Sequence, residues 1–288
     1  MTTPKILIQL DTDPQVSTFD GVVAIDAEVD HLFRHGQVEP SNVRELVHGA
    51  MFTRGGEALK NTAIFVGGSN VLAGEEVFAA VRDSFFGSVR VSMMIDSGGC
   101  NTTATAAVLS AAAHIPLEGT TALVLAATGS VGARISRLLA RRGTRVLVAS
   151  RKLDRAKKTC DQIVSLIPDA KLDAVAITSE AALRSALENV PLVFSAGAAG
   201  IQLLQTSLRE AADDLRVVID LNAVPPLGVE GIAVNDRAKT YGQAICYGAI
   251  GIGGLKLKIH KAAIRRLFEQ NDLLLDAEEI FTIGDALG

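Results

Sequence analysis

Short apolar runs alternate with longer stretches of helical periodicity along nearly the whole chain. The short runs are rich in Val, Ile and Leu, which is typical of strands that helices cover on both faces. Strands separated by about 10–15 helical residues indicate βαβ units. Because parallel strands in such units are joined by right-handed crossovers, we expect an α/β protein with doubly wound sheets.

Two such series follow one another, with a break at Pro116 and Gly119. In the first, we expect strands at residues 5–10, 63–66 and 89–95, and helices at 42–51 (capped by Ser41), 73–86 and 101–114. In the second, we expect strands at 123–126, 145–149, 174–177, 192–195 and 217–221, and helices at 130–142, 152–167, 179–188 and 203–212. A glycine-rich loop at 248–254 precedes two more expected helices, at 255–268 and 276–286. At about 150 residues per domain, the length of 288 residues also favours two domains.

The composition excludes several classes of protein. The 28 Lys and Arg residues are balanced by 32 Asp and Glu, so the basic excess of a nucleic-acid-binding protein is missing. The three cysteines are scattered without metal or disulfide spacing, which favours a reducing compartment. No apolar run reaches the ~18 residues of a membrane span, and the N-terminal run is too short for a signal peptide. We therefore expect a cytoplasmic protein that binds neither membranes nor nucleic acid.

The most informative segment is the turn after the expected strand at 123–126. It reads A-x-G-x-x-G from Ala127 onward, with alanine where the dinucleotide-binding fingerprint has its first glycine. The second and third glycines let the backbone approach a pyrophosphate and let the helix lie close to the strand. We predict that this helix N-terminus binds phosphate, although an ordinary tight turn is the alternative. The predicted cofactor-binding residues here are Thr128, Gly129, Ser130, Val131 and Gly132.

The next strand ends in Ser150, Arg151 and Lys152. An NAD site has an acidic residue near this position, which binds the ribose 2′-hydroxyl. Two cations and a hydroxyl fit a 2′-phosphate instead, because Arg151 can bind phosphate through two N–H groups. The sequence therefore favours NADP over NAD. A solvated helix N-terminus is the alternative, but the helix dipole disfavours cations at that end.

Two later strands also end in residues that suit a nucleotide. Ser195, Ala196 and Gly197 follow one strand, and their small side chains leave room for a nicotinamide ribose. Asn222 follows the next strand and is a candidate for binding the nicotinamide amide. It is equally well explained as a loop residue before the Pro225-Pro226 turn.

The candidate catalytic residues lie outside this second series. Asn101 and Thr102 belong to a run of polar donors and acceptors that opens a helix, which suits a polar heterocycle, although Asn101 is also a possible helix cap. Asp20 lies in or just after an expected loop at the end of the first strand, where a carboxylate can pair with amino-pyrimidine N–H groups or be solvated. Lys256 follows the glycine-rich loop and is a candidate cleft residue or a surface lysine. The five histidines have no metal-ligand spacing, so no metal site is expected.

The motifs as a set resemble the NADP-dependent methylene-tetrahydromethanopterin dehydrogenases of methylotrophic bacteria, which also act on methylene-tetrahydrofolate. The resemblance spans essentially the whole chain and is most specific at the Arg-Lys pair and at the glycine-rich segment with its lysines. It rests on Gln9-Leu-Asp-Thr-Asp13, Phe19-Asp20, Phe52-Thr-Arg-Gly-Gly56, Thr62-Ala-Ile-Phe-Val-Gly-Gly68, Asp96-Ser97, Asn101-Thr-Thr103, Ser150-Arg-Lys-Leu-Asp154, Asn222-Ala-Val-Pro-Pro-Leu-Gly228 and Gly248-Ala-Ile-Gly-Ile-Gly-Gly-Leu-Lys-Leu-Lys258.

This resemblance implies a Rossmann-like NADP domain at residues 105–255 and a pterin-binding α/β domain formed by residues 1–104 plus 256–288, with both ligands held in the cleft between the domains. It further implies an oxidoreductase that moves a hydride from 5,10-methylene-tetrahydromethanopterin, or the tetrahydrofolate analogue, to NADP. A homo-oligomer, trimer or higher, is expected on the same basis. The residues alone leave two alternatives open, namely another two-domain NADP oxidoreductase of the shikimate-dehydrogenase kind and a non-catalytic NADPH-binding sensor.

Overall fold

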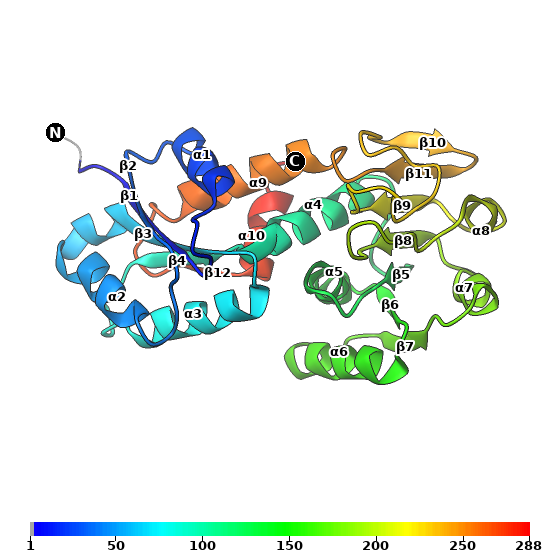
Figure 1. The fold of residues 1–288 in the computed structure, drawn as a ribbon, viewed down its shortest axis with the longest axis horizontal. Coiled ribbons are helices and arrows are strands. Elements are labelled where there is room, and N and C mark those ends of the chain that lie inside the picture. The colour runs from blue at the N-terminus through cyan, green and yellow to red at the C-terminus, as the bar shows by residue number, and fades with distance from the viewer. Residues whose placement is uncertain (1–2) are drawn as a thin grey trace. The chain divides into compact units, whose positions relative to one another are not determined.

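Two separate β-sheets organise the chain, and the computed structural model describes residues 3–288 (Figure 1). The chain divides into two compact units. Unit 1 comprises the residues up to Thr102 together with Leu257–Gly288, and unit 2 comprises Thr103–Lys256. Both divisions fall inside helices, namely α4 (Cys100–Ala112) and α9 (Gly253–Arg266). The expected α/β class with parallel, doubly wound sheets is confirmed.

The sheet of unit 1 has the strand order β12-β4-β3-β1-β2, and neighbouring strands in it are parallel. Its strands are β1 (Ile6–Asp11), β2 (His31–His35), β3 (Thr62–Gly67), β4 (Ser92–Ile95) and β12 (Leu274–Leu275). Its helices are α1 (Thr18–Asp26), α2 (Val43–Phe52), α3 (Val71–Asp83) and α10 (Ala277–Asp285), with 3-10 turns at Gly56–Asn61 and Ser97–Gly99. The C-terminal segment thus returns to unit 1 and adds β12 beside β4.

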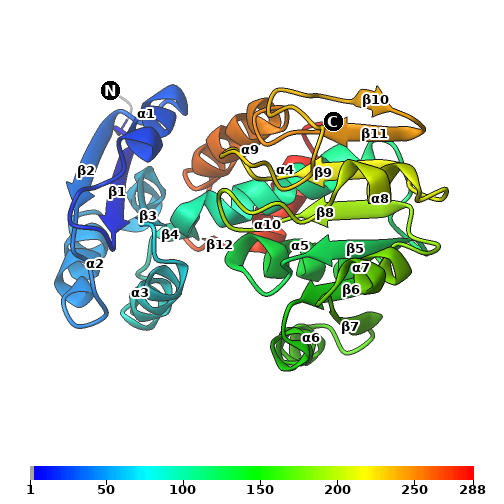
Figure 2. The ribbon, with the colours of Figure 1, turned by 45° about the vertical axis from the view of Figure 1, so that its right-hand side comes forward.

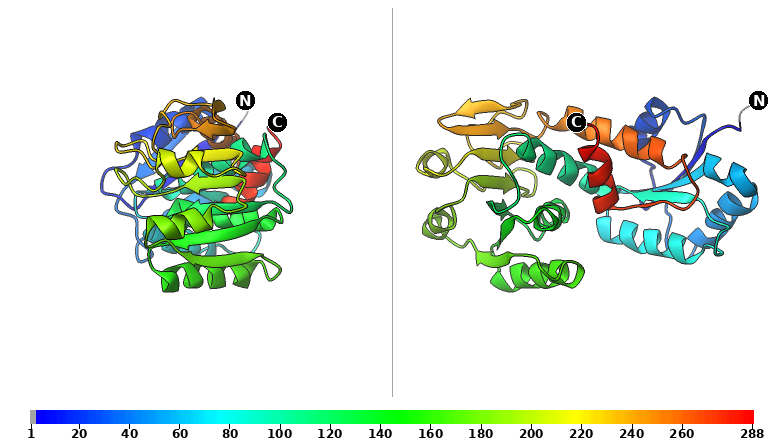
Figure 3. Two further views of the ribbon diagram at one scale, coloured as in Figure 1. Left: turned by 90° about the vertical axis from the view of Figure 1, so that its right-hand side faces the viewer. Right: turned by 180° about the vertical axis from the view of Figure 1, so that it is seen from behind.

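The strands of unit 1 alternate between two buried faces, one apolar and one that carries both polar and apolar side chains. Helices α2 and α3 cover one face, and α1 and α9 lie on the other (Figures 1 and 3). Ile8 and Leu10 of β1 pack in the core under α2 and α3, together with Ile64 and Val66 of β3. Gln9, between them in β1, is buried on the opposite face. The polar residues of unit 1 therefore gather on the side of α1 and α9.

Several expectations for unit 1 need correction. Helix α1 and strands β2 and β12 were not expected. Strand β4 begins at Ser92, because Val89 is already used in a turn that pairs it with Phe86. Asn42 rather than Ser41 is the N-cap residue of α2, and the Ser41 hydroxyl donates to Glu39 instead.

The sheet of unit 2 has the order β10-β11-β9-β8-β5-β6-β7, parallel except for the β10–β11 pair (Figure 2). Helices α5 and α6 lie on one face, and α7 and α8 on the other (Figure 1). The strands are β5 (Thr121–Leu125), β6 (Arg145–Ser150), β7 (Leu172–Ala176), β8 (Leu192–Ser195), β9 (Val217–Asp220), β10 (Lys239–Tyr241) and β11 (Ala244–Tyr247). The helices are α5 (Ser130–Arg141), α6 (Leu153–Leu166), α7 (Glu180–Ala186) and α8 (Thr206–Glu210).

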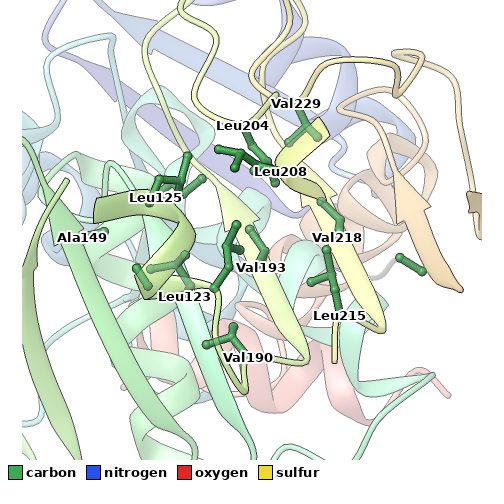
Figure 4. Close-up of a cluster of buried hydrophobic side chains, with 14 of the residues drawn as sticks. Leu123, Leu125, Ala149, Val190, Val193, Leu204, Leu208, Leu215, Val218 and Val229 are labelled. Atoms are coloured by element: carbon green, nitrogen blue, oxygen red, sulfur yellow. The ribbon is translucent and has the colours of Figure 1, made fainter. Parts of the chain in front are cut away.

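A buried aliphatic cluster holds α7 and α8 to this sheet. Leu123, Val193 and Val218 project from three adjacent strands toward Leu204 and Leu208, as Figure 4 shows. Burial of this cluster stabilises the fold by about 25 cal/mol for each Å² of apolar surface removed from water. The cluster therefore fixes the central strands whose carboxyl ends form the candidate site described below.

The boundaries in unit 2 also differ from expectation in three places. Helix α8 is much shorter than the expected 203–212, because Leu204 forms a β-bridge with Val229. The β10–β11 hairpin was not expected. Helix α9 begins at Gly253, so the last two glycines of the expected loop belong to its first turn. Among residues 3–288, no helix is both long and apolar enough to cross a lipid bilayer.

Close packing of α5 on β5 generates the first prediction. A Cβ atom at Gly132 would lie 2.7 Å from the Ala126 carbonyl oxygen and 2.8 Å from the Cα atom of Ala127. Gly132→Ala should therefore reduce the free energy of unfolding by about 1–3 kcal/mol, because backbone atoms cannot yield cheaply. Urea unfolding measures this change.

Gly49→Ala is the matched control, since Gly49 lies inside helix α2 with nothing within 4 Å of the added Cβ. It should increase stability by about 0.5–1 kcal/mol through helix propensity alone. Equal stability changes for the two alanines would contradict the packing argument.

Candidate functional site

The turn between β5 and α5 is wound tightly. Ala126 has a left-handed backbone with φ of 55°, and Gly129 is the extended N-cap residue of α5. The Gly129 N–H donates to the Ala126 carbonyl at 3.1 Å, so this N–H is already used within the turn. The strained position is Ala126, and Ala127, which stands where the fingerprint has glycine, is outside the left-handed region.

A cavity of about 380 Å³ lies at the carboxyl ends of β5, β6 and β8. Strand order reverses between β5 and β8, which is where ligands bind in open α/β sheets. Of the predicted cofactor residues, the cavity wall includes Thr128, Ser150, Arg151 and Gly197. It also includes residues that sequence reasoning missed, namely Arg155, Ile177, Ile201 and Leu203.

The basic side of the cavity is formed at the start of α6. Arg151 and Arg155 both line the cavity with exposed side chains, whereas Lys152 is the N-cap residue of α6. Arg155 lies in the first turn of α6, whose N-cap residue is Lys152, so its nearness in sequence to the predicted Arg151 and Lys152 was the signal that could have identified it. Two guanidinium groups at the end of β6 can hold a phosphate dianion.

The residues beyond β8 and β9 are organised by Asp220. This carboxylate is 1% exposed and accepts the N–H groups of Val229 at 2.9 Å and Asn222 at 3.2 Å. Burial raises the pKa of Asp220, and the Ser195 hydroxyl acts in the opposite direction. The Asn222 side chain donates to the Pro226 carbonyl at 3.1 Å and accepts from Val224 at 2.9 Å. The Asn222 side chain therefore supports the loop, as its alternative explanation as a loop residue requires.

Unit 1 collects carboxylates at the corresponding edge of its own sheet. Strand β1 ends in Asp11, β3 ends in Gly67, and β4 is followed by Asp96. A Cβ atom on Gly67 would lie 3.4 Å from Asp11 Oδ2 and 3.7 Å from Asp20 Oδ2, so these two carboxylates converge at the end of β3. The strand order of this sheet also reverses here, between β1 and β3.

Asp96 closes the first turn of α4. Its carboxylate accepts the backbone N–H groups of Asn101 at 2.9 Å and Thr102 at 3.0 Å, and the Thr102 hydroxyl at 2.6 Å. Asp96 therefore caps this helix, and Asn101 does not. The Asn101 amide donates to the Ile95 carbonyl at 2.7 Å and to Asp276 at 3.2 Å, which ties β4 to the start of α10.

His260 of α9 is the residue of this cluster that sequence reasoning missed. It is 1% exposed and stacks on Phe65 of β3, with the ring centroids 5.5 Å apart. Its Nδ1 atom lies 4.0 Å from Asp96 Oδ2. A single histidine without a recognisable spacing pattern gives no local signal of such a position.

Asp20 lies in the first turn of α1, just after the loop that follows β1, which is one of the two positions that the sequence predicted. Burial raises the pKa of Asp20, and the charges of Asp96 and Asp11 add to this effect. The His260 charge and the Ser17 hydroxyl lower it. Asp20 is thus a half-buried carboxyl whose charge is sensitive to its surroundings, which suits a ligand-binding role.

Lys256 lies in α9 and is half-buried. The catalytic roles of Lys256, Asp20, Asn101 and Thr102 stay predictions, and so do the binding roles of the cofactor set.

Two doubly wound units, one with a dinucleotide-type turn and cavity, define a two-domain nucleotide-dependent dehydrogenase fold. The ligand-free 5-ketofructose reductase of Gluconobacter sp. strain CHM43 shares this fold, with a TM-score of 0.52 and 12% identity over 99% of both chains.

Residues 18–98 match the family described as methylene-tetrahydromethanopterin dehydrogenase, N-terminal. The chain is 44% identical over 282 residues to the bifunctional protein MdtA of Methylorubrum extorquens, covering 97% of this chain and 98% of MdtA. It is 28% identical to the NAD(P)-dependent methylenetetrahydromethanopterin dehydrogenase of the same organism, over 97% of each chain. The chain belongs to the methylene-tetrahydromethanopterin dehydrogenase family. The expected family and enzyme class are thereby confirmed.

The environment of Asp20 predicts opposite effects on stability and activity. Because the folded-state pKa of Asp20 is raised, its ionised form destabilises the fold as pH rises above the unfolded value of 3.8. Asp20→Asn should therefore have a higher Tm than the wild type at pH 7, and the difference should shrink near pH 4. Activity should fall in the same variant. Calorimetry at both pH values measures the effect, and a lower Tm for the variant at pH 7 would contradict it.

Proposed function

We propose that this protein oxidises the methylene bridge of 5,10-methylene-tetrahydromethanopterin to the 5,10-methenyl form, with NADP as hydride acceptor. Under this proposal it also accepts 5,10-methylene-tetrahydrofolate. The observation that carries the proposal is the 44% identity to MdtA, which extends over 97% of the chain and thus over both units. The name of the second relative, NAD(P)-dependent methylenetetrahydromethanopterin dehydrogenase, supports the same reaction.

The residues of unit 2 fit NADP. The cavity at the carboxyl ends of β5, β6 and β8 has a close-packed helix N-terminus on one side, where Gly132 leaves no room for a Cβ atom. Arg151 and Arg155 would hold the 2′-phosphate, and Ile177 offers an apolar wall to the adenine. Gly197 leaves space at the end of β8. NADP, when bound, supplies the nicotinamide carbon that accepts the hydride.

The residues of unit 1 would bind the pterin. A carboxylate at Asp20 can accept two N–H groups of the aminopyrimidine ring in a planar arrangement. Asp11 and Asp96 are each occupied by backbone N–H groups, so they order the edge around Asp20 rather than meet the substrate. Asn101 and Thr102 would act in the same way, by fixing the start of α4.

The reaction places few demands on proton transfer. The methylene carbon loses a hydride while the lone pair of the adjacent pterin nitrogen forms the new C=N bond, and the product cation is shared between two nitrogens. The chain therefore contributes mainly by holding donor and acceptor carbons in contact. A protonated lysine beside this cation would be repelled, so Lys256 is assigned to orientation of the pterin carbonyl.

We also propose a cytoplasmic homo-oligomer, a trimer or higher. Large apolar side chains on the surface of unit 1 support a subunit interface, since Phe33, Phe52 and Phe86 are each more than half exposed.

A spectrophotometric assay tests the reaction. Purified protein with methylene-tetrahydromethanopterin and NADP should form NADPH and methenyl pterin in equal amounts, and NAD should be a poorer acceptor. Binding of NADP without turnover of either pterin would contradict the proposal and favour a sensor, whereas turnover of a hydroxy acid would favour the shikimate-dehydrogenase kind.

The arginines of the cavity generate a prediction about cofactor choice. Arg151→Gln and Arg155→Gln should each raise the KM for NADP about tenfold or more, and leave the KM for NAD nearly unchanged, because only NADP carries the 2′-phosphate. Steady-state kinetics with both nucleotides measures the ratio. Arg184→Gln on α7 is the matched control, since this arginine is exposed and paired with Glu180. An equal loss with both nucleotides would refute the 2′-phosphate assignment.

A further inference from the structure

Arg34 lies on the edge strand β2 and links three segments of unit 1. Its Nε atom donates to Gln9 Oε1 of β1 at 3.1 Å. Its Nη2 atom donates to the carbonyl oxygens of Val16 at 2.9 Å and Ser17 at 2.7 Å, just before helix α1. One guanidinium group thus joins β2, β1 and the loop that leads into α1.

The same contacts determine where α1 begins. Ser17 is the N-cap residue of α1, its hydroxyl accepts the Asp20 N–H at 3.3 Å, and its own N–H donates to Asp11 at 3.0 Å. Gln9 adds a donor to the Ser17 carbonyl at 3.4 Å. Because Asp20 lies only three residues after Ser17, a shift of the cap moves the Asp20 carboxyl.

Helix α1 lies directly against the guanidinium group of Arg34. A Cβ atom on Gly21 would be 3.4 Å from Arg34 Cζ, so the backbone of α1 next to Asp20 lies within van der Waals reach of the guanidinium group. β2 and α1 are neighbours at one end of the unit 1 sheet (Figure 1). Arg34 therefore sets both the start of α1 and the approach of its first turn to the strand.

The influence of Arg34 on Asp20 is geometric. The groups that shift the pKa of Asp20, besides its burial, are His260, Ser17, Asp96 and Asp11. These come from α9, the loop before α1, the segment after β4, and β1. Arg34 contacts the chain around Asp20 through backbone carbonyls and an amide, and its planar fork of donors is the feature that a lysine lacks.

We propose that Arg34 is a positioning residue for the pterin subsite, which fixes the first turn of α1 so that Asp20 meets the aminopyrimidine ring. The inference rests on the proposed function and adds a residue outside the predicted site. Since small misplacements of a binding group reduce rates steeply, loss of the clamp should act on the pterin and not on NADP.

Steady-state kinetics of Arg34→Gln and Arg34→Lys tests the inference in the full-length protein. Both variants should lower kcat/KM for methylene-tetrahydromethanopterin about tenfold, mainly through a higher KM. The dissociation constant for NADP should stay at its wild-type value. Gln9→Met, which removes the amide acceptor at similar volume, should produce a smaller effect in the same direction and serves if an Arg34 variant does not fold.

Arg82→Gln is the matched control, because Arg82 is an exposed arginine of unit 1 that pairs with Asp83. It should match the wild type in every parameter. Wild-type kcat/KM in Arg34→Gln would overturn the inference, because Arg34 would then have no positioning role. Full rescue by Arg34→Lys would also overturn it, because the positive charge alone would then be sufficient. Weakened NADP binding parallel to the loss of pterin affinity would also overturn it. Absence of turnover by the wild type would instead contradict the proposed function, and the inference with it.

Discussion

Parallel pairing of strands is the constraint on which both units depend. When helices connect parallel strands, the carboxyl ends of all these strands reach one edge of the sheet, and the residues that follow each strand meet there. In unit 2 this edge brings together the turn after β5, the arginines after β6 and Gly197 after β8. In unit 1 it brings together Asp11 and Asp96, with Asp20 close to Asp11. The same topology thus gives unit 2 an edge with exposed arginines and unit 1 an edge with buried carboxylates.

The two edges differ in how their charges are held. Arg151 and Arg155 are exposed, so water solvates both guanidinium groups. The carboxylates of unit 1 are buried, and backbone N–H groups hold Asp11 and Asp96 in place. Such fixed donors stabilise a buried charge without adding a mobile partner. Asp20 receives less compensation, and this leaves it as the carboxyl of the cluster best suited to bind a ligand.

Local sequence patterns were sufficient for the central features of the fold and for part of the site. The turn with Gly129 and Gly132, the basic residues after β6 and the two series of strands all carry signals within a few residues of one another. Helix α1 and strand β2 carry no such local signal. Strand β2 is a largely exposed edge strand, and its sequence does not alternate between apolar and polar residues. Arg34 and His260 acquire their positions from pairing and packing between distant segments, so spacing along the chain could not identify them. Asp20 stays a predicted site residue, and its helical position follows from the cap at Ser17, whose carbonyl accepts from Arg34.

In the proposed reaction a hydride passes directly from the methylene carbon of the pterin to the nicotinamide of NADP. The migrating atom therefore does not exchange with water. The most direct test uses methylene-tetrahydromethanopterin with deuterium in the methylene bridge, followed by mass spectrometry of the reduced nucleotide. Direct transfer predicts that each NADPH formed carries one deuterium. The labelled substrate should also react more slowly if hydride transfer limits turnover. Loss of the deuterium to solvent would contradict it.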